Sequence, residues 1–369
     1  MSRIEPSVLG DWWKSIDSYT FSLVFLLSVS GLVFLMAGSP TVAFRLNLST
    51  FHFVRNQIIY MLPAFSAIFI ISFFPLRWVR RLALIVYIGS FALILLTFHF
   101  DARNGAHRWV DIAGTSIQPS EFIKPAFVIL VSWALAERER HRDMPANTIA
   151  FLLLPVTIIP LILQPDIGQT ALILVVWCSL FFVAGLAWIK VAVLICSGFF
   201  MAIAAYLLMP HFQSRIDRFL NADSGDNFQV ETALKCFTEG DWLGVGLGEG
   251  AVKRYLPDGH TDFIFAVIGE EFGIIICLVV LCIFACIVLR GLYLARQNSN
   301  IFCRYGITGL ITLFGLQASF NMMVNVNLAP AKGMTLPFIS YGGSSLLSLG
   351  LTVGFILALT RRRLSIEML

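Results

Sequence analysis

Asp262 is the acidic residue whose position best suits chemistry at a membrane surface. It ends the polar run Tyr255-Leu-Pro-Asp-Gly-His-Thr-Asp262, and an apolar run beginning Phe263-Ile-Phe follows directly. An acid at this boundary has access to both the polar and the lipidic part of a substrate. The alternative is that Asp262 only caps the following helix, because Asp is a favoured N-cap residue.

Other charged residues lie within or next to apolar segments, where a charge is costly and needs a partner or a function. Glu121 and Lys124 are three residues apart and can pair on one helix. Such a pair either lets the helix enter the membrane or lines a polar cavity. Asp166 follows a proline and either caps the next helix or lines the same kind of cavity. Glu270 and Glu271 cannot share one helix face, so we expect at least one to be structural.

Two glycine-containing segments are further candidates for a site. The run Gly244-Val-Gly-Leu-Gly-Glu-Gly250 is not set in a βαβ pattern, which argues against a nucleotide loop and favours a turn whose backbone approaches a ligand. The segment Lys332-Gly-Met-Thr-Leu-Pro-Phe-Ile-Ser-Tyr-Gly-Gly343 combines an isolated cation with several hydroxyls. Gly and Pro at such places mark broken helices that line sites in membrane proteins, although a plain surface turn would look similar.

The elements that must position these residues are membrane helices. Of the 369 residues 58% are hydrophobic and 13% are charged, about half the charged share of a soluble domain. We predict an all-α integral membrane protein forming a single domain over 1–369, and nothing indicates nucleic-acid binding. Ten apolar segments are near the ~20 residues that cross a bilayer. They are approximately 20–38, 57–75, 82–99, 121–136, 148–164, 168–186, 191–209, 264–289, 305–327 and 342–360.

The distribution of cations predicts the orientation of these helices. The N-terminus, the C-terminus and the alternate short loops carry 15 Lys or Arg, whereas the opposite short loops carry five. The cation-rich side should be cytoplasmic, with both termini on it. The longest loop, 210–262 between the seventh and eighth helices, is then periplasmic and is the expected place of function.

Several of these segments resemble the SEDS family (shape, elongation, division and sporulation) of peptidoglycan glycosyltransferases. The form of Thr335 to Ser345 is more similar to the division branch, FtsW, than to the elongation branch, RodA. Asp258-Gly259 departs from the usual family pattern, but Asp262 matches the family's essential loop aspartate. The matching segments are Asn104 to Trp109, Gln118 to Lys124, Gln164 to Gly168, Gly244 to Gly250, Tyr255 to Glu271 and Lys332 to Ser345.

The resemblance implies a glycan polymerase in the bacterial inner membrane, at the division septum. A glycan linked to undecaprenyl pyrophosphate would be transferred onto lipid II, with Asp262 as general base. Arg108, Lys124 and Lys332 would handle phosphate charge or orient Asp262, beside Glu121. Ser340, Tyr341 and Gly342 would shape the cavity. A divalent cation, Mg²⁺ or Mn²⁺, could screen the pyrophosphate. Expected partners are a class B penicillin-binding protein, which is a transpeptidase, and other division proteins.

Two other functions fit buried charges among many helices. A lipid II flippase would also need a charged path through the membrane. A scaffold that only recruits a transpeptidase would need no catalytic acid. Polymerisation by the purified protein separates the enzyme from both alternatives.

Overall fold

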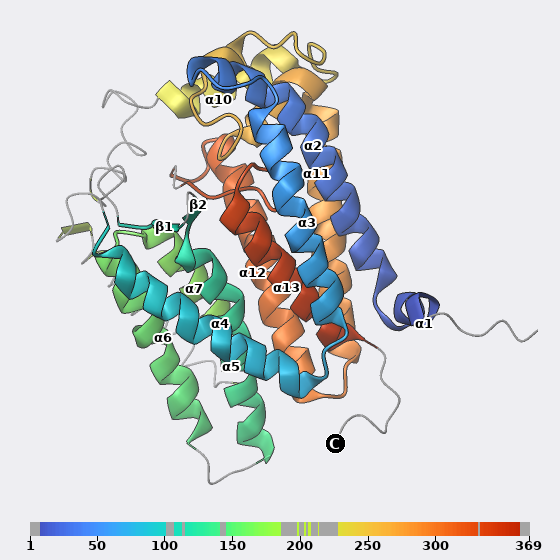
Figure 1. The fold of residues 1–369 in the computed structure, drawn as a ribbon, viewed down its shortest axis with the longest axis vertical. Coiled ribbons are helices and arrows are strands. Elements are labelled where there is room, and N and C mark those ends of the chain that lie inside the picture. The colour runs from blue at the N-terminus through green and yellow to red at the C-terminus, as the bar shows by residue number, and fades with distance from the viewer. Residues whose placement is uncertain are drawn as a thin grey trace, which may run out of the picture.

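The computed structural model of the protein describes residues 8–100, 107–112, 115–140, 145–185, 228–330 and 333–361, with a few isolated residues between 198 and 213. The described chain is a bundle of long helices (Figure 1). A single antiparallel hairpin joins β1 (Val110–Ile112) to β2 (Thr115–Ile117), with Val110 opposite Ile117. The helices are α1 (Val8–Ser15), α2 (Ser18–Arg45), α3 (His52–Ser72), α4 (Leu76–Thr97), α5 (Pro119–Arg140), α6 (Ala146–Leu163), α7 (Ile167–Val183), α10 (Phe228–Gly240), the 3-10 helix η1 (Val252–Tyr255), α11 (Ile264–Gln297), α12 (Ile301–Asn325) and α13 (Gly343–Thr360).

The predicted membrane helices are confirmed wherever the structure describes them. Eight described helices are long and apolar enough to cross a membrane, and α7 is a shorter apolar helix. The predicted division at Gln164 to Asp166 is correct, since α6 ends at Leu163 and α7 begins at Ile167. The expected segment 191–209 lies almost wholly outside the described residues. The prediction of a single domain over 1–369 stays a prediction.

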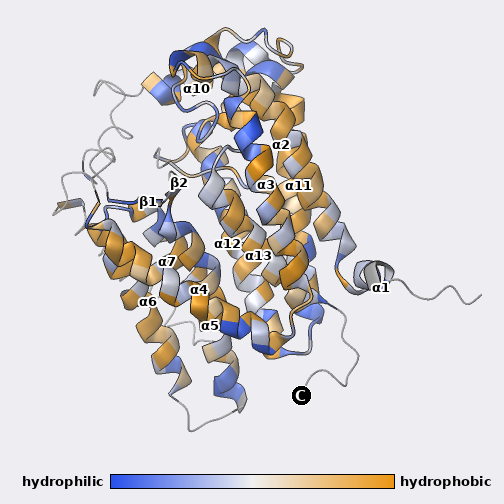
Figure 2. Ribbon diagram, viewed as in Figure 1, coloured by the Kyte–Doolittle hydropathy of each residue, from blue (hydrophilic) through white to orange (hydrophobic). Residues whose placement is uncertain are grey.

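Helix burial follows the position of each helix in the bundle. Most of α5 and α13 is buried, whereas α3, α4 and α11 leave most of their surface on the outside. Hydrophobic residues cover the outer faces along their length, and hydrophilic residues gather at the two ends of the bundle (Figure 2). This arrangement suits helices whose outer faces contact lipid and whose ends contact water.

The two ends of the described chain lie together. The guanidinium of Arg361, just after α13, donates a hydrogen bond to the Ser15 hydroxyl of α1 at 3.1 Å. Helix α10 and the 241–262 segment lie at the opposite end of the bundle (Figure 1). The predicted long loop therefore contains a helix and a 3-10 turn in its described part, at the end away from both termini. That the termini are cytoplasmic stays a prediction.

Helix α11 is broken at Gly273, which has φ 81° and ψ 172°. The segment after α10 satisfies the freed backbone groups on both sides of the break. The N–H groups of Ile274 and Ile275 donate to the carbonyls of Asp241 and Trp242. The N–H groups of Val245 and Gly246 in turn donate to the carbonyls of Glu270 and Glu271.

The break also indicates where α11 meets the membrane surface. At ~1.5 Å per residue, the stretch 274–297 suffices to cross a ~30 Å hydrocarbon core. The stretch from Ile264 to the break is therefore not needed to span that core, and Asp262 precedes it.

Candidate active site

Asp262 lies in a tight turn just before α11. The N–H groups of Thr261 and Phe263 both donate to the Asp258 carbonyl at 3.1 Å. The N-cap residue of α11 is Phe263, so Asp262 is not the helix cap that the alternative interpretation required. Gly333 lies against its carboxylate, since a Cβ at Gly333 would be 3.3 Å from Asp262 Oδ2. The acid is therefore held between this turn and the segment before α13.

The surroundings of Asp262 make it a stronger base than an ordinary aspartate. Burial, followed by repulsion from Asp258, raises its pKa from 3.8 to about 7. The side chain nevertheless keeps partial exposure at the surface. Within the part of the chain that the structure describes, its carboxylate has no hydrogen-bond or ion-pair partner. A carboxylate with this basicity and access suits proton abstraction near neutral pH.

The segment before α13 ties down the turn that carries Asp262. The Ser340 hydroxyl donates to the Thr261 carbonyl at 2.6 Å and accepts from Leu336 N–H at 2.7 Å. Tyr341 N–H donates to the His260 carbonyl at 2.9 Å. Both predicted cavity residues are thus engaged in holding the turn, and their contact with substrate stays a prediction.

His260 is packed into this junction between aromatic rings. Its ring centroid lies 4.3 Å from that of Phe53 and 5.7 Å from that of Tyr341. Burial and the positive charge of Arg45 lower its pKa to about 4, so the imidazole is neutral at physiological pH. His260 therefore supports the turn as an uncharged aromatic group.

Two further predicted residues, Lys332 and Gly342, belong to the segment before α13. Gly342 is the N-cap residue of α13. Lys332 lies outside the described residues, so its role stays a prediction. Its neighbour Gly333 has φ 67°, a conformation that favours glycine, and this conformation accompanies the close approach to Asp262.

A second group of polar side chains lies buried among α5, α7 and α12. Lys124 Nζ is 3.0 Å from Glu121 Oε2, which confirms the predicted pair, and 3.2 Å from Gln317 Oε1. Gln169 Nε2 donates to Glu121 Oε1 at 2.6 Å. The ammonium and the carboxylate are thus bound to each other and to amides, which reduces the cost of their burial.

Arg108 and Asp166 extend this buried group toward the hairpin. The closest approach of the guanidinium to the Asp166 carboxylate is 3.8 Å, and Arg108 also donates to the Pro165 carbonyl. Asp166 occupies the N-cap position of α7, but its side chain makes no capping hydrogen bond and instead accepts from the Ser120 hydroxyl at 3.4 Å. Burial raises the pKa of Asp166 despite the nearby Arg108. Arg108 is therefore engaged by protein groups, and a phosphate contact stays a prediction.

One face of α12 connects this group to Asp262, and sequence analysis missed it. Gln317 Nε2 is 3.4 Å from both oxygens of Thr335, in the segment before α13. One turn later, Asn321 Nδ2 donates to the Asp262 carbonyl at 2.8 Å, and Asn325 Nδ2 donates to the same carbonyl at 2.9 Å. The signal was present as amides at i, i+4 and i+8 within an apolar segment.

Glu270 and Glu271 hold the glycine-rich turn. The Glu270 carboxylate accepts from the N–H groups of Val252 and Lys253 at 2.7 Å each. Glu271 pairs with the Lys253 ammonium and accepts from Gly248 N–H at 3.1 Å. Both acids are structural, and the close backbone approach that the glycines allow is an approach to α11. A side chain at Gly244 would collide with the Glu271 carbonyl.

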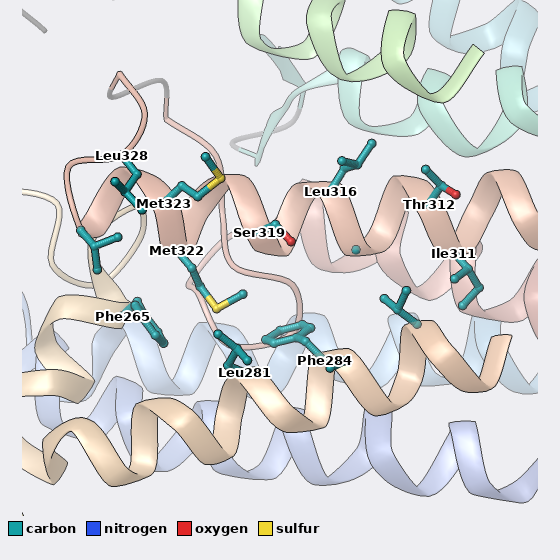
Figure 3. Close-up of a pocket in the computed structure, with 14 residues that line it drawn as sticks. Phe265, Leu281, Phe284, Ile311, Thr312, Leu316, Ser319, Met322, Met323 and Leu328 are labelled. Carbon is teal, nitrogen blue, oxygen red and sulfur yellow. The ribbon is translucent and has the colours of Figure 1, made fainter. Parts of the chain in front are cut away.

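An apolar groove lies between α11 and α12 (Figure 3). Its volume is about 610 Å³. Phe265, three residues after Asp262, lines one part of it, and Phe284, Gly315, Ser319 and Met322 line others. The groove could receive an apolar chain or helix from the membrane.

No group of three or more His, Cys, Asp or Glu side chains in metal-binding arrangement occurs among the described residues. The described residues thus offer no preformed set of cation ligands, and a cation would be held mainly by the oxygens of a bound pyrophosphate. The cation itself stays a prediction.

Known proteins resemble this chain over nearly its whole length. Residues 17–364 match the model of the FtsW, RodA and SpoVE family, described as cell cycle proteins. The probable peptidoglycan glycosyltransferase FtsW of Caulobacter vibrioides is 39% identical over 368 residues, which cover 98% of this chain and 93% of that protein.

Solved structures share the fold. Thermus thermophilus RodA, a rod shape determining protein, is 25% identical with a TM-score of 0.68, covering 94% of this chain and 97% of that one. A chain from a structure described as structural coordination of polymerization and crosslinking by a peptidoglycan synthase complex is 24% identical with a TM-score of 0.78, covering 94% and 98%. The family model matches most of the chain, and a curated relative is 39% identical over nearly its full length. This multi-pass membrane protein therefore belongs to the FtsW, RodA and SpoVE family of cell cycle proteins.

Proposed function

We propose that this protein polymerises peptidoglycan glycan strands from lipid II during septal wall synthesis, with Asp262 as general base. The names of its FtsW relatives support the activity. The observation that carries the proposal is the placement of Asp262. Asp262 is a partly exposed residue just before α11, and its carboxylate has no partner among the described residues.

The reaction needs a base where a sugar hydroxyl meets a lipid-linked glycan. The hydroxyl oxygen of lipid II forms a bond to the anomeric carbon of the growing glycan, and the bond from that carbon to the pyrophosphate breaks. The hydroxyl proton passes to Asp262, and the negative charge goes to the departing undecaprenyl pyrophosphate. With a pKa of about 7, Asp262 is substantially deprotonated near neutral pH and still basic enough to accept this proton.

The pyrophosphate requires positive charge in the transition state. We assign this role to Lys332, adjacent to Gly333 at the Asp262 carboxylate, with Arg108 and Lys124 as further candidates. Lys124 and Arg108 are already bound to protein groups. A bound Mg²⁺ or Mn²⁺ would supply further charge on the pyrophosphate oxygens.

The proposed partner is a class B penicillin-binding protein that crosslinks the new strands. The synthase complex similar in fold to this chain supports such coupling. A transpeptidase that crosslinks these strands at the same membrane would contact the polymerase inside the membrane. We assign the membrane helix of the transpeptidase to the α11–α12 groove. Gly315 and Ser319 are four residues apart there, and small residues at that spacing allow close helix approach.

The partner contact is tested by filling the groove. Ser319→Trp should abolish co-purification with the transpeptidase and leave basal polymerisation unchanged. Ile85→Trp, at an exposed apolar position on α4, is the matched control. Unchanged co-purification of the Ser319 variant would refute this contact, and loss of basal polymerisation with retained partner binding would indicate a lipid substrate in the groove.

Reconstitution tests the activity itself. Purified protein, alone and with the transpeptidase, is given lipid II, and the glycan product is separated by length. We expect polymer. Movement of lipid II across vesicles without polymer would favour a flippase, and partner binding without either activity would favour a scaffold.

A further inference from the structure

The side chain of Asn325 bridges the residue before α11 and the first turn of that helix. The first backbone bonds of α11 run from the N–H groups of Ala266 and Val267 to the Phe263 carbonyl, at 3.1 and 3.3 Å, so the Asp262 carbonyl lies outside this ladder. Asn325 Nδ2 donates to the Asp262 carbonyl at 2.9 Å, and Asn325 Oδ1 accepts from Ala266 N–H at 3.0 Å. One buried amide thus ties the main chain of Asp262 to the first turn of α11.

Asn321 makes a second contact to the same carbonyl and connects it to another segment. Its Nδ2 donates to the Asp262 carbonyl at 2.8 Å and to the Met334 carbonyl at 2.6 Å. Met334 follows Gly333, which lies against the Asp262 carboxylate. Asn321 therefore sets the distance between the turn that carries the acid and the segment that covers it.

These contacts require amides at both positions. Asn321 and Asn325 are almost wholly buried, and Asn325 Nδ2 also donates to the Asn321 carbonyl at 2.9 Å. A carboxylate could accept from Ala266 N–H but could not donate to the Asp262 carbonyl. A hydrophobic residue at either position would remove one of the two side-chain donors to that carbonyl.

We propose that Asn321 and Asn325 are positioning residues that fix the Asp262 carboxylate for proton abstraction. The proposal rests on the function of Asp262 proposed above. Two side chains from one helix converge on the main chain of a single residue, and that residue is the candidate base. An error of about 1 Å in the placement of a catalytic group can cost on the order of a hundredfold in rate.

The test measures lipid II polymerisation by the full chain with its transpeptidase between pH 5 and 9. Asn321→Leu and Asn325→Leu keep the side-chain volume and remove the hydrogen bonds. Thr308→Val is the control, because it removes a buried hydroxyl of α12 that bonds only to the Arg304 carbonyl in the same helix. Asn321→Ser and Asn325→Ser serve where the Leu variants do not fold, as judged by melting temperature.

We expect kcat to fall about tenfold or more with little change in KM, and the acid limb of the pH profile to move to lower pH. The limb moves because a displaced Asp262 is better solvated and its pKa falls toward its ordinary value. Among the described residues, the other titratable or charged groups at this junction are Asp258 in the same turn, His260, Tyr341 and the Arg45 of α2. A merely structural loss lowers the amount of active protein and leaves the limb in place.

Two outcomes overturn the proposal. Folded Asn variants with wild-type kcat and pH profile would do so, and so would variants with reduced activity on an unmoved acid limb. Asp262→Asn, measured in parallel, separates this proposal from the function on which it rests. If Asp262→Asn is inactive while the Asn variants resemble wild type, only the positioning role fails. If Asp262→Asn is active, the assignment of the base fails.

Discussion

Three acids lie within ten residues of one another, and the structure treats them in opposite ways. Glu270 and Glu271 are 1% exposed, and their carboxylates bind backbone N–H groups and the Lys253 ammonium. Asp262 is partly exposed, and its carboxylate has no such partner within the described ranges. Its main-chain carbonyl, in contrast, is bound twice by α12.

The difference distinguishes acids that stabilise the fold from an acid that is available for catalysis. Partners that stabilise a charged carboxylate make it a poor base, because they lower the pKa. The main chain of Asp262 is held by hydrogen bonds, while its carboxylate has no partner among the residues that the structure describes. Perturbed basicity with access from outside is typical of functional acids.

The largest expected effect is on catalysis, from Asp262→Asn. Asn keeps the shape and most of the hydrogen-bonding capacity but removes the charge and the basic oxygen. Polymerisation should fall by on the order of a hundredfold or more, the usual contribution of a general base. Melting temperature and partner binding should stay near wild type. A folded variant with near-normal polymer output would show that Asp262, like the two glutamates, is not the catalytic base.

Glu270→Ala should show the opposite behaviour, with its main effect on stability. The change leaves the N–H groups of Val252 and Lys253 without their acceptor, at a cost on the order of 3 kcal/mol. Thermal unfolding of the purified protein measures it, and Glu249→Ala, an exposed acid of the same turn, is the control. An unchanged melting temperature would show that Glu270 does not hold this turn.

Lys332→Met should reduce polymerisation by about tenfold or more, because it removes a charge proposed to stabilise the departing pyrophosphate. Lys332 is the lone charge between Asn325 and Gly343. Insertion and melting temperature should be unchanged. Lys235→Met, at an exposed position on α10, is the control, and equal activity of the two variants would show that Lys332 does not act on substrate.

The smallest effect is expected from cysteines that report topology. Ser224→Cys and Asn298→Cys, in a background without reactive thiols, should keep full activity and react with impermeant reagents from opposite sides of the membrane. The 15 to 5 distribution of cations predicts this result. Labelling of both from one side would place Asp262 and the Glu270 turn on a different face from the one proposed.

Much of the fold was predictable because the bilayer acts on each segment separately. The apolar runs gave the described membrane helices within a few residues, apart from extensions at the polar ends of α2, α3, α4 and α11. Those extensions were missed because hydropathy ends where polar residues begin, while the helix continues. The small hairpin was also missed, since its strands are three residues each.

The candidate site was predictable only in part. Asp262 stood out because it lies at the boundary of a polar and an apolar run, and Glu121 and Lys124 because their spacing allows pairing. The glycine-rich turn was interpreted as approaching a ligand, whereas it approaches α11. The contact of this turn with α11 could not be predicted from a sequence pattern, because the hydrogen bond from Gly248 N–H to the Glu271 carboxylate joins residues 23 positions apart.

The sequence by itself determined the membrane environment, the approximate places of the described apolar helices, and the acid at the boundary of a polar and an apolar run, since these depend on local composition. The tertiary structure decided that Glu270 and Glu271 are paired and that the Asp262 carboxylate has no partner within the described ranges. It also decided that Asn321 and Asn325 meet at the Asp262 carbonyl, 59 and 63 residues away. Hydrogen bonds have short range and fixed direction, so their partners depend on which helices become neighbours and how those helices are rotated.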